Sequence, residues 1–310
     1  MLRDASTDVK EHYYDLHFHG VDWDARVAKA QDEIAKASSL NMAMSHVAAA
    51  LDSLNDSHTF FLPPMRPYRH DYGFLLQMIG DRCFVIRVRP RSDAEAKGVK
   101  PGDELLAING FGLSRNSLWK VEYVFNSLRP QPGLRLILKD LSGAERQVDV
   151  LAQIEQIVGG GRYGTEDAGD LARQDEDARH RRRARGIAVD HGIGVLKLPV
   201  FEFSASNVAD MMEEMRAYKS LVLDLRGNPG GAVDTLKAFV SSLFRKEVKI
   251  MIDGKSLEHA GVVPDEIVLP TAADLAEGRD PVLANAIETL GGRISPQNAG
   301  NLFPFEWPTR

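Results

Sequence analysis

Two adjacent glycines, Gly230 and Gly231, stand where an apolar strand pattern gives way to a helix pattern. They end the stretch 223–231, which reads LDLRGNPGG. Adjacent glycines at a helix N-terminus let backbone N–H groups approach a ligand oxygen, and the helix dipole favours negative charge there. This arrangement suits an oxyanion hole for acyl transfer. A tight strand-to-helix turn without chemistry explains the same residues equally well.

Metal chemistry has little support in the sequence. His12, His17 and His19 lie close together, but no carboxylate or cysteine frame with zinc spacing accompanies them. We therefore expect surface or packing histidines, no metal and no other cofactor. Cys83 is the only cysteine, which excludes an intrachain disulfide, and its apolar neighbours predict a buried strand thiol.

The composition is that of an ordinary globular protein. The 310 residues include 38 Lys+Arg and 44 Asp+Glu, which gives a net charge of −6. Binding to nucleic acid depends on a basic surface, so we expect no nucleic-acid partner. No stretch offers the roughly 20 apolar residues that a membrane span needs, and the first residues do not resemble an export signal. We expect a chain without a membrane span.

Two kinds of pattern fill the first half of the chain. Residues 1–66 show helical periodicity, including an apolar stripe over 44–54, and predict a helical N-terminal cap. Residues 72–157 show short strands separated by turns, with one helix over 116–128, and predict a small β-barrel. The hairpin signals are the dipeptides Gly80-Asp81 and Asn109-Gly110.

The second half begins with a charged stretch. Residues 158–190 carry glycines, then acidic residues, then arginines, with almost no apolar periodicity, and we expect a linker. Residues 191–310 alternate strand and helix patterns, which predicts an α/β region with a parallel sheet. Ser206 is the expected N-cap of its first helix.

One part of the strand-rich region resembles a PDZ domain. The stretch 98–105, GVKPGDEL, resembles the most recognisable segment of such domains, and Tyr72-Gly73-Phe74 resembles their carboxylate-binding loop. The resemblance implies that an extended peptide is bound as an added strand, with backbone N–H groups holding its terminal carboxylate. The residues expected to bind the peptide are Tyr72, Gly73, Phe74, Leu75, Leu118 and Val121.

Four motifs in a fixed order extend the resemblance to nearly the whole chain. DSHT at 56–59 precedes the PDZ-like region, and LDLRGNPGG at 223–231 and DGKSLEHAGVVPD at 253–265 follow it. In this order they resemble the tail-specific (carboxyl-terminal processing) serine peptidases, including their tricorn-like members. The resemblance implies an α+β multidomain fold with a helical N-terminal cap, a PDZ-like β-barrel and a truncated α/β peptidase core of the ClpP/crotonase type.

The resemblance also implies roles for single residues. In tricorn-like members the histidine that matches His58 is the general base, and the residues that match Ser57 and Glu258 orient it. The glycine that matches Gly230 or Gly231 offers an oxyanion N–H. Imidazole titrates near neutral pH, which suits the role given to His58. A cap or loop hydrogen bond is the alternative explanation for this histidine.

The nucleophilic serine of the family has no counterpart in this sequence. Family members place it in a long stretch after the second core helix, whereas here the chain passes from Phe244 through Lys246 to Ile252 directly into the 253–265 motif. Several tens of family residues are therefore missing, and with them central strands of the sheet. Since an exposed sheet edge tends to pair, we expect the segment 246–252 to pair with the remaining sheet or with another subunit in a homo-oligomer. We expect no replacement nucleophile among Ser204, Ser206, Ser241, Ser242 and Ser256.

Three hypotheses follow for the function. The first is a tail-specific peptidase homologue that has lost catalysis and still binds polypeptide C-termini or unfolded protein substrates through its PDZ-like domain. The second is an active serine peptidase whose nucleophile comes from another position or another subunit. The third is a PDZ scaffold whose α/β region only stabilises it. The family resemblance suggests a periplasmic or secreted protein.

Overall fold

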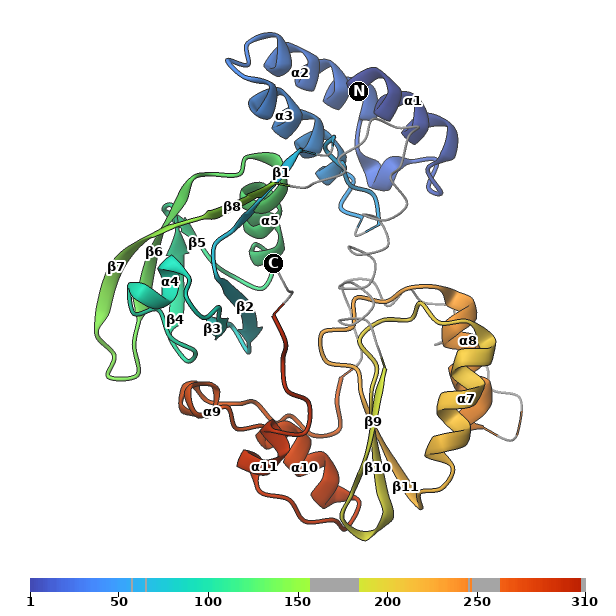
Figure 1. Ribbon diagram of the computed structural model, residues 1–310. Coiled ribbons are helices and arrows are strands. Elements are labelled where there is room, and N and C mark those ends of the chain that lie inside the picture. Colours follow the sequence, from blue (N-terminus) through green and yellow to red (C-terminus); the bar gives the residue numbers. More distant parts are fainter. Residues whose placement is uncertain (57, 65, 157–183, 245, 247–262, 308–310) are drawn as a thin grey trace.

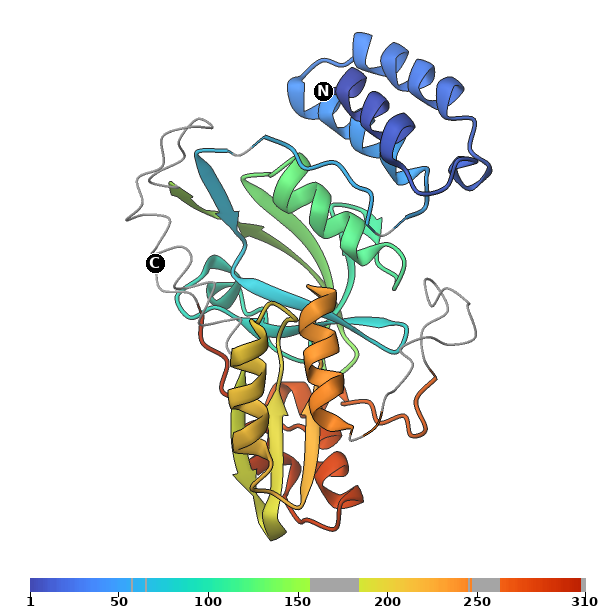
Figure 2. The ribbon, with the colours of Figure 1, turned by 90° about the vertical axis from the view of Figure 1, so that its right-hand side faces the viewer.

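The computed structural model describes residues 1–310 except 57, 65, 157–183, 245, 247–262 and 308–310. The described chain forms three regions (Figure 1). A helical region, coloured blue, lies at one end, and a β-sheet region in cyan and green follows it. A second sheet with helices on both faces, coloured yellow to red, lies at the other end, as the view from the side also shows (Figure 2).

The helical region contains three helices and a short 3₁₀ turn. They are α1 (Leu2–His12), η1 (Phe18–Gly20), α2 (Trp23–Ala35) and α3 (Leu40–Asp52). Side-chain caps fix the starts of the last two helices, because Asp22 accepts the N–H of Ala25 and Ser39 accepts the N–H of Met42. Trp23, Leu51 and Leu54 pack into a buried cluster between the helices. The predicted helical pattern is confirmed.

The strands of the second region form one main sheet and one two-stranded ribbon. The main sheet has the order β2-β3-β4-β6-β7, with β5 paired to β4. Its strands are β2 (Phe74–Ile79), β3 (Arg82–Val88), β4 (Glu104–Ile108), β5 (Phe111–Gly112), β6 (Gly133–Lys139) and β7 (Glu145–Leu151). The ribbon joins β1 (Tyr68–Asp71) to β8 (Gln153–Gln156), and the short helix α4 (Asp93–Ala96) follows β3. Both predicted hairpin turns are present. Asn109 and Gly110 have positive φ angles of 48° and 83°, as a two-residue turn of this kind requires.

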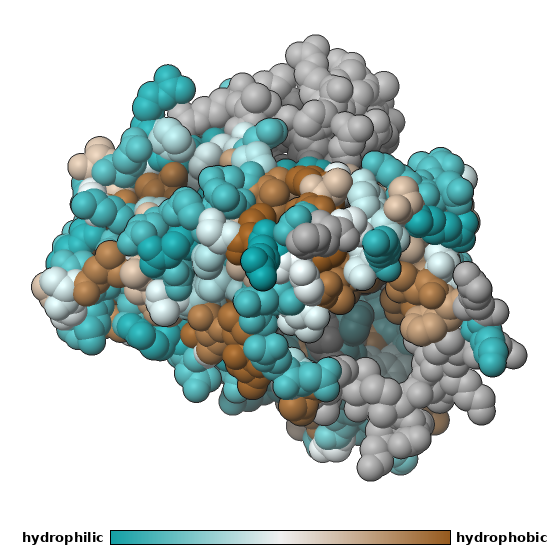
Figure 3. Space-filling view, turned by 90° about the horizontal axis from the view of Figure 1, so that it is seen from below, coloured by the Kyte–Doolittle hydropathy of each residue, from teal (hydrophilic) through white to brown (hydrophobic). Residues whose placement is uncertain are grey.

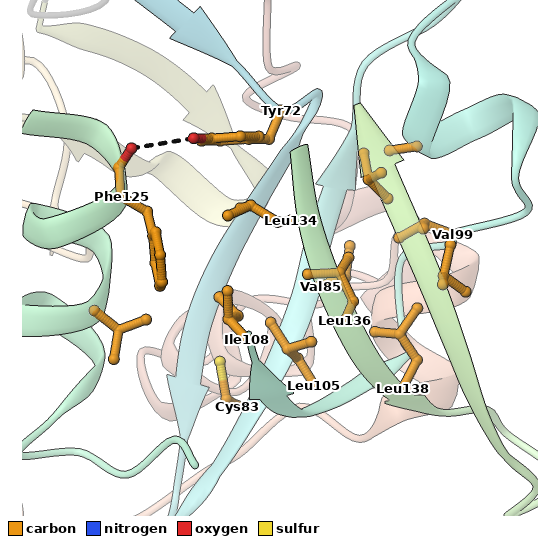
Figure 4. Packing of buried hydrophobic residues seen from close by; sticks show 14 of the residues in the cluster. Tyr72, Cys83, Val85, Val99, Leu105, Ile108, Phe125, Leu134, Leu136 and Leu138 are labelled. Carbon is orange, nitrogen blue, oxygen red and sulfur yellow. Dashed lines mark hydrogen bonds between the residues drawn. The ribbon is translucent and has the colours of Figure 1, made fainter. Parts of the chain in front are cut away.

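A helix packs across this sheet and changes its pitch halfway. The α-helix α5 (Leu118–Tyr123) continues as the π-helical turn η2 (Val124–Leu128). In this turn the N–H of Arg129 donates to the Val124 carbonyl at 2.7 Å, so the Phe125 carbonyl lacks its usual helical donor. The Tyr72 hydroxyl donates to that carbonyl instead, at 3.1 Å (Figure 4). The wider turn therefore anchors the helix to Tyr72, two residues before the start of β2.

The third region is a three-stranded sheet between two pairs of helices. Its strands are β9 (Arg185–Val189), β10 (Ile193–Lys197) and β11 (Ser220–Asp224), in the order β11-β10-β9, with the 3₁₀ turn η3 (Asp190–Gly192) between β9 and β10. The parallel pairing of β10 and β11 confirms the predicted parallel sheet. Its helices are α7 (Ala205–Met215), α8 (Val233–Leu243), α9 (Ala272–Glu277), α10 (Pro281–Thr289) and α11 (Pro296–Gly300). α7 and α8 cover one face of the sheet, and α10 and α11 cover the other (Figures 1 and 2).

Two sequence assignments in this region are wrong. The linker expected over 158–190 includes Arg185–Val189, but these residues form β9. This strand pairs antiparallel with the buried β10 and gives it a partner on its second edge. Ser204, not Ser206, is the N-cap of α7, because the helix begins two residues earlier than expected and the Ser204 hydroxyl accepts the N–H of Asn207. The proposed pairing of 246–252 falls almost entirely outside the described residues.

The face of the molecule seen from below is mainly hydrophilic (Figure 3). Seen from below, separate hydrophobic patches interrupt a hydrophilic surface (Figure 3). Within the described part of the chain, no helix combines the length and the apolar character needed to cross a bilayer.

We expect the change Tyr72→Phe to destabilise the strand-rich region by roughly 1–3 kcal/mol, because the hydroxyl also bonds the carbonyl and N–H of Gln131 at 3.0 Å. Cys83 reports on this region, since it is buried in the same core (Figure 4) and burial, with nearby Glu122, raises its pKa to about 12. Thiol labelling across a urea series should begin at lower urea in the variant. Tyr68→Phe, at an exposed tyrosine on β1, is the control, and equal labelling midpoints in all three proteins would contradict the anchor.

Candidate functional site

The Gly230-Gly231 turn lies between the end of β11 and the start of α8. Both glycines have positive φ angles, 108° and 141°. A Cβ atom on Gly231 would lie 2.3 Å from the Phe201 carbonyl oxygen, so a larger residue has no room there. Two backbone hydrogen bonds hold the turn against Phe201. The Phe201 N–H donates to the Gly230 carbonyl, and the Phe201 carbonyl accepts the N–H of Ala232.

The two glycine N–H groups are not equivalent. The N–H of Gly230 donates to the side-chain oxygen of Asn228 at 2.7 Å, and the Asn228 amide in turn donates to the Leu198 carbonyl. The bridge to Phe201 uses the groups on either side of Gly231, so the Gly231 N–H points away from Phe201. Gly231 is exposed and precedes the N-terminus of α8. Of the two sequence-predicted oxyanion donors, only Gly231 has its N–H oriented for an external oxygen.

A buried carboxylate fixes the strand ends that carry this turn. The Asp224 side chain is 3% exposed and receives two hydrogen bonds from the Arg226 guanidinium, at 2.8 and 2.9 Å. The backbone N–H of Arg226 and the Lys197 Nζ each donate one more, at 3.1 Å. Arg226 also forms a two-bond ion pair with Asp280, the N-cap of α10. Burial alone would raise the pKa of Asp224, but the hydrogen bonds and charges of Arg226 and Lys197 outweigh it and hold the pKa at about 2.

His58 lies after α3, and its side chain is 91% exposed. The backbone N–H of His58 donates to Asp56 Oδ1 at 2.9 Å, and the ring atom Nδ1 lies 3.9 Å from the same oxygen. Burial alone would raise the pKa of Asp56, but the hydroxyl of Thr59 and the N–H of His58 lower it below its usual value. A carboxylate therefore stands beside His58 that the sequence reasoning did not single out, although it belongs to the DSHT motif.

The predicted catalytic residues are only partly placed. Ser57 and Glu258 lie outside the described residues. The contacts described for His58 are with Asp56, and those described for Gly230 and Gly231 do not involve His58. Two candidate serines form hydrogen bonds within their own helices. Ser204 caps α7, and the Ser242 hydroxyl donates to the Ala238 carbonyl inside α8. His19 bridges the Tyr14 hydroxyl and the Leu54 carbonyl.

The predicted carboxylate-binding loop is held from two sides. The N–H of Gly73 donates to Asp71 Oδ1 at 2.8 Å, and the Gly73 carbonyl accepts the N–H of Arg89 at 2.7 Å. The Arg89 side chain, 9% exposed, completes the frame with an Nε to Asp71 Oδ2 distance of 2.7 Å. Gly73 has a φ of 78°, and a Cβ atom there would lie 2.4 Å from Ser92 Cβ. Sequence reasoning found Gly73 but missed Asp71 and Arg89, which become neighbours only when β2 and β3 pair.

Strand β2 is an outer strand of the main sheet. Because the Gly73 carbonyl faces β3 and consecutive backbone groups alternate in direction, the N–H and C=O of Phe74 point toward the open edge. A cavity of about 2380 Å³ is lined by the consecutive residues Leu75 to Ile79 and, on its other sides, by residues of the peptidase region that include 264–270 and 303–307. Since neighbouring side chains of a strand point to opposite faces, a cavity that touches all of them runs along the edge of β2.

The remaining predicted peptide-binding residues lie deeper. Leu118 and Val121 of α5 are each 8% exposed and belong to the core under the sheet, and neither lines the cavity. Tyr72 is also buried, and burial raises its pKa. The hydrogen bond from Tyr72 to Phe125 joins the C-terminal end of the α5 segment to the start of β2. The hydrogen bond from Arg115 to the Gly80 carbonyl joins the N-terminal end of that segment to the end of β2. The helix therefore runs antiparallel beside β2.

We expect Asp224→Asn to destabilise the protein at pH 7 by roughly 2–3 kcal/mol, the free-energy equivalent of a pKa lowered from 3.8 to about 2. Because the folded pKa is the lower one, this stabilisation is complete above pH 4 and disappears as the pH falls toward 2. Urea unfolding of both proteins between pH 7 and pH 2 measures the difference. Asp234→Asn, at a 94% exposed carboxylate on α8, is the control, and a difference that stays constant with pH would refute the assignment.

Comparison with known proteins gives two domain matches. The PDZ domain family matches residues 64–133, and peptidase family S41 matches residues 192–268. The carboxy-terminal processing protease CtpB of Bacillus subtilis (strain 168) is 20% identical over 249 residues, which are 72% of this chain and 47% of CtpB. The chain therefore spans about half the length of this curated relative.

Solved structures show the same fold. Mature CPAF has a TM-score of 0.52 and 17% sequence identity, over 77% of this chain and 57% of CPAF. CPAF in complex with lactacystin has a TM-score of 0.50, also with 17% identity, over 77% of this chain and 58% of that chain. The order of a PDZ domain and a family S41 segment, with the relatedness to CtpB, leads to one assignment. These matches support a tail-specific, or carboxyl-terminal processing, protease family with a PDZ domain.

Proposed function

We propose that this protein binds the C-termini of polypeptides through its PDZ domain and does not itself hydrolyse them. The observation that carries the binding is the open edge of β2, where the Phe74 N–H and C=O point outward next to the Gly73 loop. An extended peptide adds to such an edge through main-chain hydrogen bonds. Periplasmic or secreted location stays a prediction of the family resemblance.

The frame around Gly73 suits a terminal carboxylate. Asp71 already accepts the Gly73 N–H, so the Phe74 N–H is the loop donor directed outward. Arg89 pairs with Asp71 and offsets its negative charge beside the site that an anionic peptide end would occupy. Leu118 and Val121 form the floor against which an apolar terminal side chain packs when it parts β2 from α5.

The absence of hydrolysis is supported by the sequence and by the roles of the described serines. The family position of the nucleophile has no counterpart after Phe244, and Ser204 and Ser242 are engaged at the helices that carry them. The Gly231 N–H keeps the orientation of an oxyanion donor, but a donor without a nucleophile forms no acyl-enzyme. An active enzyme with a nucleophile from another position or subunit is the alternative that the second experiment tests.

Peptides with an apolar last residue should bind the full chain with micromolar or weaker affinity when their C-terminus is free, and detectably more weakly when it is amidated. Gly73→Ala should abolish binding, because its Cβ atom collides with Ser92. Gly143→Ala is a matched control, since that glycine has a φ of 87° and a Cβ atom there would meet only Lys139 Cε, at an ordinary contact distance of 3.9 Å. Isothermal titration measures all three proteins, and equal affinity for free and amidated peptides would remove carboxylate recognition from the proposal.

A serine-directed fluorophosphonate probe should label no serine of the folded protein, and an unfolded protein substrate should stay intact. An active serine hydrolase in the same assay serves as the positive control. Mass spectrometry of the probe-treated chain gives the result. Stoichiometric labelling of one serine, lost in His58→Ala, would establish the active-enzyme alternative.

A further inference from the structure

The C-terminal segment Phe303–Trp307 joins the two sheets of the molecule. It leaves α11 and rises along the side of the PDZ domain (Figure 1). Its alternate residues Phe303, Phe305 and Trp307 are aromatic. Each of these rings lies over at least one cationic side chain, and those cations belong to different sheets.

The first ring contacts the peptidase sheet. Phe303 lies 5.5 Å from the guanidinium carbon of Arg185 on β9 and 5.8 Å from Lys197 Nζ on β10. Arg185 also donates a hydrogen bond of 3.1 Å to the carbonyl of Pro304. Lys197 is the same residue that pairs with Asp224. This end of the segment is therefore fixed to the strand ends that carry the Gly230-Gly231 turn.

The other two rings contact the PDZ domain. Phe305 lies 5.4 Å from the guanidinium carbon of Arg87 on β3, and Trp307 lies 4.5 Å from that of Arg89. The two rings also pack edge to face, with centroids 5.2 Å apart. Trp307 covers the arginine that pairs with Asp71 beside the peptide loop. A cation over an aromatic ring contributes more when water is excluded, and the Arg89 side chain is 9% exposed.

The PDZ domain has a second contact with the peptidase region. Helix α9 approaches Gly102 so closely that a Cβ atom on this glycine would lie 2.5 Å from the Ala272 carbonyl oxygen. Gly80 similarly faces Leu269. The PDZ domain thus touches the peptidase region at α9 and at the aromatic segment, both of which belong to residues 263–307.

We propose that Phe303–Trp307 is a strap that fixes the PDZ domain against the peptidase sheet, and that Trp307 is its terminal anchor. Losing the strap leaves α9 as the main remaining contact, and the domain then moves relative to the sheet. Each lost cation–π contact should raise the fraction of detached PDZ domain roughly 2- to 30-fold. The proposal does not depend on whether the PDZ domain binds peptides.

The test places spin labels at Gln147→Cys on β7 and Asp210→Cys on α7, both exposed positions, and measures their separation by pulsed electron resonance in the full chain. Buried Cys83 stays unlabelled in the folded protein. The unmodified strap should give one narrow distance distribution, and Phe305→Ala with Trp307→Ala should broaden it. Trp307→Phe keeps a ring over Arg89 and should stay close to the original. Phe60→Ala, an exposed aromatic in the helical region, is the control.

Two results would overturn the strap. An unchanged distance distribution in the double variant means that α9 alone fixes the domain. A broadened distribution in which Cys83 also becomes reactive means that the rings stabilise the fold of the PDZ domain and not its position.

Discussion

The Asp224 carboxylate is the constraint on which the peptidase region depends. It is almost fully buried at the end of β11, and a buried charge is tolerated only with partners that replace water. Arg226 and Lys197 supply them, and Arg226 extends the network to Asp280 at the start of α10. One interaction network thus joins two parallel strands and a helix on the far face. The Gly230-Gly231 turn follows β11, so this network fixes the strand end that carries the turn.

The PDZ domain is built around a comparable anchor without charge. The Tyr72 hydroxyl donates to the Phe125 carbonyl, which the π-helical turn leaves without a helical donor. This hydrogen bond sets the distance between α5 and β2. The helical region then packs on the outer side of the same helix, where Lys120 pairs with Asp52 and Arg66 donates to the Leu128 carbonyl. The helix is therefore fixed from both sides.

Much of this protein was predictable from local pattern. The hairpins at Gly80-Asp81 and Asn109-Gly110 depend on positive φ angles that these residue types adopt at low cost, so the dipeptides were sufficient evidence. The apolar period of α3 and of α7 also identified helices directly. The order of the motifs identified the family, which the domain matches and CtpB support.

Other features exist only after distant segments meet. The charged run that leads into β9 hid a strand that needs β10 as its partner, and local periodicity carries no information about such a pairing. Asp71 and Arg89 lie 18 positions apart and become a pair only through the register of β2 and β3. The sequence by itself determined most helices and hairpins, the family resemblance and the glycine turns, because these depend on local residue patterns. The tertiary structure decided that Gly231 and not Gly230 presents its N–H, because the bond from Gly230 to Asn228 forms only in the folded turn.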